Sequence, residues 1–149
     1  MKQLIAGMGN VLALVLLAAA ILAVVPATQA RAQDEALEAG KAAVDSWLVL
    51  VDNGQYAESW AAASTYFKNA LGEDDWVQAL NGARSPMGAV KERVHFTAQY
   101  TASLPGAPDG QYVVVEFRTA FENKSEAVET VTAMLDNDGA WRVGGYYIK

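Results

Sequence analysis

The sequence predicts an α+β domain in which three N-terminal helices pack against a curved, four-stranded antiparallel sheet. Apolar residues recur with helical periodicity in the first half of the domain, and runs rich in β-branched and aromatic residues fill the second half. Helices followed by strands, without alternation, are typical of folds whose helices gather on one face of an antiparallel sheet.

Residues 1–32 have the features of a secretory signal peptide. Lys2 precedes an apolar run at residues 11–25, and Ala30-Arg31-Ala32 fits a cleavage site, with cleavage after Ala30 as the second option. The run is shorter than the roughly 20 residues that a spanning helix needs, although retention as an N-terminal anchor stays open. We therefore expect a periplasmic or secreted protein with no membrane attachment after cleavage. An exported chain without cysteine fits the bacterial periplasm best.

Residues 33–149 are expected to form a single domain. Subtracting 32 from 149 leaves 117 residues, which is enough for a core without disulfides. Of the 11 basic residues, Lys2 and Arg31 fall in the signal peptide, so 9 basic residues remain against 17 acidic ones, a net charge of 9 − 17 = −8. A surface of this charge repels phosphate backbones, so nucleic acid is excluded as a partner class.

The helical half shows three amphipathic segments. In the first, Val44, Leu48 and Val51 share one face, and Asn53-Gly54 provides a stop signal because Gly adopts the left-handed conformation easily. The last opens on the acidic turn Glu73-Asp74-Asp75, which suits the positive end of a helix dipole. The predicted helices span residues 34–52, residues 55–69 and about residues 73–83.

The second half shows four strand-like runs separated by polar turns. In the first run, apolar residues such as Val94 and Phe96 alternate with polar residues such as Arg93 and His95, so we expect the apolar set to be buried and the polar set to be exposed. In the last run, Gly144-Gly145 predicts a bulge or a bend. The predicted strands span residues 90–104, 112–121, 127–135 and 140–148.

Element order and short motifs together suggest a fold group and a family. A curved four-stranded sheet wrapped on three helices is the cone of the NTF2-like (cystatin-like) group, which we expect here. The ordered motifs are Ser59-Trp60, Arg84-x-Pro86-x-Gly88, Leu104-Pro-Gly-Ala-Pro-Asp-Gly-Gln-Tyr112, Glu129-Thr-Val131 and Gly139-x-Trp-Arg-Val-x-Gly-Tyr-Tyr147. With these motifs the chain resembles the exported bacterial family catalogued as domain of unknown function 4019. The resemblance implies an exported single-domain protein and carries over no activity, substrate or catalytic residue.

Glu129 is the candidate for acid/base chemistry, with Arg84 in support. It lies in a strand otherwise made of Val, Thr, Met and Leu, so an inward Glu129 would place a carboxylate in a mostly apolar cone. With Tyr146, Tyr56 or Tyr100 as a donor, this arrangement predicts an isomerase-like or dehydratase-like enzyme. A structural ion pair, or a Glu129 on the outer face of the sheet, explains the same residues, and we prefer this interpretation to the enzyme.

Aromatic residues on the predicted inner surfaces could line a ligand cavity instead of only filling a core. The candidate ligand-binding residues are Trp60, Trp76, Arg84, Glu129 and Tyr146.

Other chemistry has little support in the sequence. His95 is the single histidine and is expected on the exposed face, where one imidazole makes neither a catalytic triad nor a metal site. Residues 136–139 have the start of a calcium loop but lack its remaining ligands, and a hairpin turn explains them. We therefore predict no metal and no cofactor.

Two function hypotheses follow. The first is an exported, non-catalytic domain that binds a small apolar ligand in the cone, or an envelope protein through the outer face of the sheet. The alternative is an isomerase-like or dehydratase-like enzyme that uses the inward carboxylate. A homodimer is expected by analogy with the fold group only.

Overall fold

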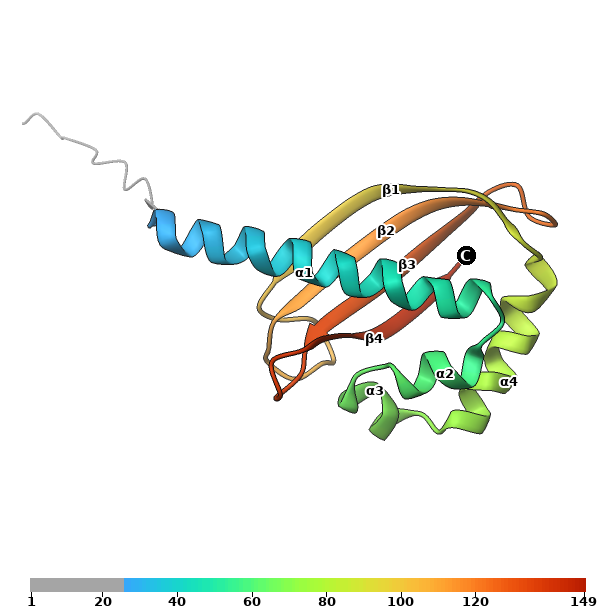
Figure 1. Cartoon of the computed structure of the whole chain (residues 1–149), viewed down its shortest axis with the longest axis horizontal. Helices are drawn as coiled ribbons and strands as arrows, with labels where there is room; N and C mark the ends of the chain where they lie inside the picture. The colour runs from blue at the N-terminus through green and yellow to red at the C-terminus, as the bar shows by residue number, and fades with distance from the viewer. Residues whose placement is uncertain (1–25) are drawn as a thin grey trace, which may run out of the picture.

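The structure is a computed structural model that describes residues 26–149. The apolar run of the predicted signal peptide, residues 11–25, lies outside the described residues. Figure 1 shows a long helix, α1, lying along one face of a curved sheet, while the shorter helices gather near the C-terminal end of α1. The predicted α+β class is confirmed.

The sheet is a four-stranded antiparallel meander with the strand order β1-β2-β3-β4. Polar turns join the last three strands, as the sequence predicts. In the β3–β4 turn, Arg142 pairs with Asp136 and Asp138, and its hydrogen bonds lower the pKa of Asp138 to about 2. The strands are β1 Val90–Thr101, β2 Tyr112–Phe121, β3 Ala127–Leu135 and β4 Trp141–Ile148.

Helix α1 spans Ala27–Asp52, so it begins earlier than the predicted residue 34. Residues 26–35 are exposed, and Ala36 is the first buried residue of the helix. The helix ends at Asn53-Gly54 as predicted, with Gly54 at a φ of 73°. The early start therefore adds an exposed N-terminal extension to α1. The buried face of the helix still contains Val44, Leu48 and Val51, as the periodicity predicts.

The single helix predicted over residues 55–69 is wrong, because the chain forms two short helices there. These are α2, Tyr56–Ala61, and α3, Thr65–Ala70. The Ser64 hydroxyl accepts a hydrogen bond from the Phe67 amide and caps α3, while the Ser64 amide donates to the Val143 carbonyl of β4 at 2.8 Å. The break between α2 and α3 is therefore hydrogen-bonded to β4, the edge strand of the sheet. The described residues form four α-helices instead of the predicted three.

Helix α4 spans Glu73–Ala83, as predicted, and starts with three acidic residues. A 3₁₀ turn, η1, at Ser85–Met87 then leads the chain into β1. Pro86 sits inside this turn, where its fixed φ is compatible with helical geometry.

The predicted faces of β1 are wrong over its first half. The pairing with β2 shifts between His95 and Thr97, so that Phe96 is an extra residue, a β-bulge. Residues before the bulge therefore have the parity opposite to that of residues after it. Val94 and Phe96 are exposed on the outer face, at 51% and 52%, whereas Arg93 points towards the core.

The core lies between α1, the short helices and the inner face of the sheet. The Gly144 region carries the predicted irregularity, since the β3–β4 register shifts there. The central buried residues include Val44, Trp47, Leu48, Val51, Phe67, Trp76, Leu80, Val113, Val115, Phe117, Val131 and Val143.

Candidate functional site

Glu129 lies on the inner face of β3 and its side chain is completely buried. Its Oε2 atom accepts hydrogen bonds from Arg93 Nε at 2.7 Å and Thr119 Oγ1 at 2.5 Å. Its Oε1 atom accepts from Tyr146 Oη at 2.6 Å and Arg93 Nη2 at 3.1 Å. Glu129 therefore faces inward, and both of its oxygens are doubly hydrogen-bonded.

Arg93 joins this carboxylate to a second one at the end of α1. Its guanidinium donates to Asp52 from Nη1 at 2.6 Å and from Nη2 at 3.0 Å. Burial alone would lower the pKa of Arg93, but the hydrogen bonds and charges of Asp52 and Glu129 raise it above its ordinary value. Arg93 is therefore a permanent cation that links β1, β3 and α1.

Arg84 is close to the Glu129 site but does not contact the carboxylate. Its Nη2 donates to Asp52 at 3.2 Å, its Nη1 donates to the Gly88 carbonyl at 2.7 Å, and its guanidinium carbon lies 4.4 Å from the ring centroid of Phe121. Its Nε is buried and has no hydrogen-bond partner within residues 26–149. Arg84 thus reaches the site only through Asp52.

Tyr146 connects the polar network to the aromatic core. Its ring packs against Trp47 and Trp76, with centroid distances of 5.5 and 6.3 Å. Burial, followed by the charge of Glu129, raises the pKa of the Tyr146 hydroxyl above its ordinary value. The hydroxyl therefore stays protonated and acts as a hydrogen-bond donor at any physiological pH.

The candidate ligand-binding residues do not form one group. Tyr146 packs against Trp76 and donates a hydrogen bond to Glu129, so these three residues are linked. Trp60 lies apart from them among the short helices, where its indole N–H donates to the Leu71 carbonyl at 2.7 Å. Trp76 donates its own indole N–H to Ser59 Oγ at 2.9 Å. These contacts describe a satisfied core.

The network can hold charge but has no position open for proton transfer. Each carboxylate oxygen offers about two lone-pair sites, and all four sites of Glu129 are taken by donors of the chain itself. The hollow at the β2–β3 end of the sheet and the one on α4 are not lined by Glu129, Arg93 or Tyr146. The geometry therefore favours the structural ion pair over the enzyme.

Sequence reasoning missed Arg93, Asp52 and Thr119 as partners of the network. Strict alternation predicts Arg93 on the solvent face, and the bulge at Phe96 puts it on the inner face instead. His95 is likewise on the inner side, where its Nε2 lies 3.1 Å from Asp45 of α1 and its ring packs on Phe117, although its side chain remains 46% exposed. The available signal was Glu129, the one charged residue of β3, because a buried carboxylate requires a nearby cation.

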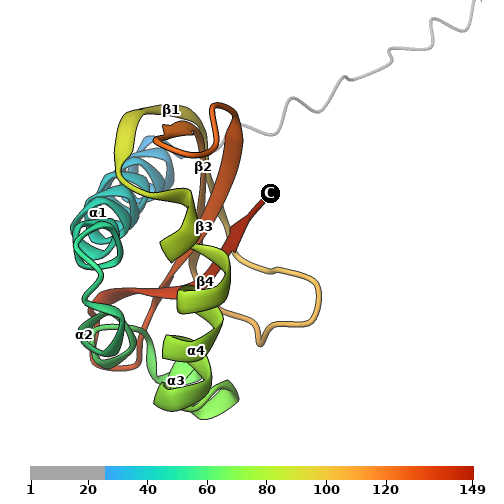
Figure 2. The same ribbon diagram turned by 90° about the vertical axis from the view of Figure 1, so that its right-hand side faces the viewer.

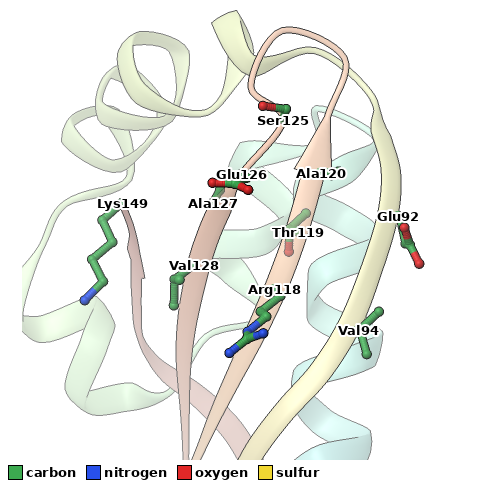
Figure 3. Close-up of a pocket in the computed structure, with 10 residues that line it drawn as sticks. All are labelled: Glu92, Val94, Arg118, Thr119, Ala120, Ser125, Glu126, Ala127, Val128 and Lys149. Carbon is green, nitrogen blue, oxygen red and sulfur yellow. The ribbon is translucent and has the colours of Figure 1, made fainter.

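The outer face of the sheet carries the larger hollow, with a volume of about 570 Å³ (Figure 3). Figure 2 shows α1 on one side of the sheet and the β1–β2 connection, residues 102–111, on the other side. Residues from all four strands or their ends line the hollow, which lies at the β2–β3 turn end of the sheet. They are Glu92, Val94, Arg118, Thr119, Ala120, Ser125, Glu126, Ala127, Val128 and Lys149.

Within residues 26–149, no three His, Cys, Asp or Glu side chains lie close enough together to hold a metal ion. No helix of this region is long and apolar enough to cross a bilayer.

Comparison with known proteins gives a family and no activity. No curated protein matches the chain. The family described as "Protein of unknown function (DUF4019)" matches residues 43–146, a range that runs from α1 through the short helices and the sheet into β4. The match covers well over half of the sequence and includes Asp52, Arg93, Glu129 and Tyr146. The chain therefore belongs to the DUF4019 family.

Proposed function

We propose that this protein is an exported, non-catalytic binding domain with an NTF2-like cone, whose outer sheet face binds another protein of the cell envelope. The contrast between the two faces of the sheet supports this proposal. The inner face is filled, whereas the outer face carries Val94, Phe96 and Tyr147 at 51%, 52% and 62% exposure beside the 570 Å³ hollow. Exposed apolar surface rimmed by polar residues is typical of interaction sites.

A small apolar ligand inside the cone has less support. The space between the helices and the inner face holds the rings of Trp47, Trp76 and Tyr146, which pack against one another in tilted and edge-to-face pairs. Phe67 packs edge-on against Trp76 at 5.0 Å. A ligand there would have to displace buried aromatic contacts. The outer face, in contrast, is available without rearrangement.

The enzyme alternative also has less support, because Glu129 would need to release a donor before it could accept a proton. Its strongest donor, Arg93, is itself held by Asp52. No observation on this chain favours that rearrangement.

The export part of the proposal is tested by the N-terminus of the protein recovered from a bacterial periplasmic fraction. Intact mass analysis should give a chain that starts at Gln33, or at Arg31 if cleavage follows Ala30. Recovery of the chain only from the cytosol, starting at Met1, would contradict export.

The binding part is tested by photo-crosslinking in living cells. A photoreactive phenylalanine analogue replaces Phe96 or Tyr147 on the outer face, and Tyr66 on α3, which is 38% exposed, serves as the matched aromatic control. We expect one discrete protein adduct from positions 96 and 147 and none from position 66, with the adduct identified by mass spectrometry. Adducts from position 66 alone would refute the outer face as the binding surface.

A further inference from the structure

We propose that the protein bound by the outer face is a second copy of this chain, related by a two-fold axis that runs across the strands. The inference rests on the proposed function and names its partner. It is carried by four charged residues that line the 570 Å³ hollow, each of them exposed and none of them in an ion pair within the described part of the chain. They are Glu92, Arg118, Glu126 and Lys149.

These four residues form two adjacent rows of opposite charge (Figure 3). Arg118 pairs with Val94 on one side and Val128 on the other, and the Val128 amide bonds the Lys149 carbonyl, so Arg118 and Lys149 share a row. Glu92 pairs with Ala120, two residues along β2 from Arg118, and Glu126 lies two residues before Val128, directly before β3 begins. Two residues of a strand span about 7 Å, so the carboxylate row lies about 7 Å from the cation row.

A two-fold axis placed between the two rows makes the surface complementary to itself. The rotation puts the cation row of one copy over the carboxylate row of the other. Arg118 then lies over the partner's Ala120, with carboxylates on the two neighbouring strands about 4.8 Å to either side, within reach of a guanidinium. Lys149 lies in the same way beside the partner's Glu126.

The same operation is sterically acceptable. The β1–β2 connection, residues 102–111, lies on the outer side at the end of the sheet away from the hollow (Figure 2). An axis across the strands sends the two connections to opposite ends of the dimer, where they flank the partner and do not collide. An axis along the strands would bring them to the same end.

The available area predicts a reversible dimer. Four strands about 4.8 Å apart, overlapping over about eight residues of about 3.3 Å each, give roughly 500 Å² per copy and roughly 1,000 Å² in total. This total is near the lower limit for specific interfaces and is typical of weak or transient ones. Val94, Ala120 and Val128 supply apolar contacts between the charged rows.

The balance of charge favours a second copy over a small charged ligand. Two carboxylates and two cations line the hollow, so it offers no net charge to an anion or a cation. It offers instead a row of cations beside a row of carboxylates, which best fits a surface with the same two rows in reverse order. In addition, Arg118 is already oriented, since its guanidinium carbon lies 3.9 Å from the ring centroid of Phe96.

The test is sedimentation equilibrium of the protein as the cell processes it, with charge reversals. The native protein should dimerise reversibly, and Arg118→Glu or Glu126→Arg should each raise the dimer dissociation constant at least about tenfold, because the two-fold axis doubles every repulsive contact. An equimolar mixture of the two variants should restore dimerisation, since each variant then faces the opposite charge. Lys68→Glu on α3 and Glu58→Arg on α2 are matched controls that should leave dimerisation unchanged.

Several results would overturn the inference: a native protein that stays monomeric, single variants that dimerise like the native protein, or a mixture that fails to recover. Circular dichroism and thermal melts confirm that the variants remain folded, which is expected for exposed positions. A monomer that still crosslinks from position 147 to a different protein removes the second copy and leaves the proposed function standing. A native protein that is monomeric and gives no adduct from position 147 would contradict both the second copy and the proposed function.

Discussion

Gly40→Ala is the perturbation that tests the packing of α1 on the sheet most directly. Gly40 is buried in the middle of α1, and a Cβ built on it would lie 2.5 Å from both Cβ and Cγ2 of Val113. Ordinary van der Waals contact begins near 3.4 Å, so the helix and β2 would have to separate by about 1 Å. The atom that blocks the methyl group is a Cβ, which no change of rotamer can move.

The magnitude follows from two opposing terms. Overpacking a tight core costs about 1–3 kcal/mol, and the rigid contact with Val113 places Gly40→Ala near 3 kcal/mol. Replacing Gly by Ala inside a helix returns about 1 kcal/mol. The net destabilisation is therefore about 2 kcal/mol, which for a domain of this size lowers the melting temperature by roughly 8 °C.

Gly82→Ala is the matched control, because Gly82 lies in α4 with nothing within 4 Å of the added methyl group. That variant should be neutral or more stable, by up to about 1 kcal/mol. The assay is a pair of urea denaturation curves and thermal melts on both variants. A Gly40→Ala protein as stable as the Gly82→Ala protein would refute the close approach of α1 to β2.

The remaining predictions concern the polar network and one helix cap. Arg93→Ala should lower the free energy of unfolding by about 3–5 kcal/mol, because it leaves the buried Glu129 carboxylate without its cation. The double variant Arg93→Met, Glu129→Leu removes both charges and should cost less than Arg93→Ala, as measured from urea denaturation midpoints. Tyr146→Phe should cost about 1–3 kcal/mol at neutral pH. Because the pKa of Tyr146 is raised on folding from an ordinary value of about 10, the stability that its hydroxyl contributes is intact below pH 10 and is lost as the pH rises further. The native and variant denaturation curves should therefore stay apart up to about pH 10 and approach each other above it. Ser64→Ala should cost about 1 kcal/mol in thermal melts; an unchanged melt would exclude the cap.

The order and type of the main elements could be predicted from the sequence because periodicity and turn chemistry are local. Glu129 shares the inner face with Val131, as simple alternation along β3 allows, because the pairing of β3 with β2 is regular from Ala127 to Met134. The division of the second predicted helix into α2 and α3 could not be predicted, because it depends partly on a contact with a residue far away in the sequence. The Ser64 amide finds its partner in Val143, far along the chain.

The charge partner of Glu129 could not be predicted for a similar reason. Strict alternation puts Arg93 and Ala98 on opposite faces, and they share the inner side only because Phe96 is an extra residue in β1. A bulge depends on the register with the neighbouring strand and leaves little trace in one sequence. The sequence predicts Arg84 as the cation that supports Glu129, but in the structure Arg93 forms the ion pair with Glu129.

The bulge at Phe96 also bears on how this strand can vary in length. Loss of one residue at this point would restore simple pairing on β2 without turning over the residues on either side, because the extra residue has no partner of its own. A one-residue loss within the evenly paired part of β3 would instead exchange the buried and solvated sides beyond it. Insertions and deletions among relatives should therefore collect around residue 96 and avoid the strand that holds Glu129.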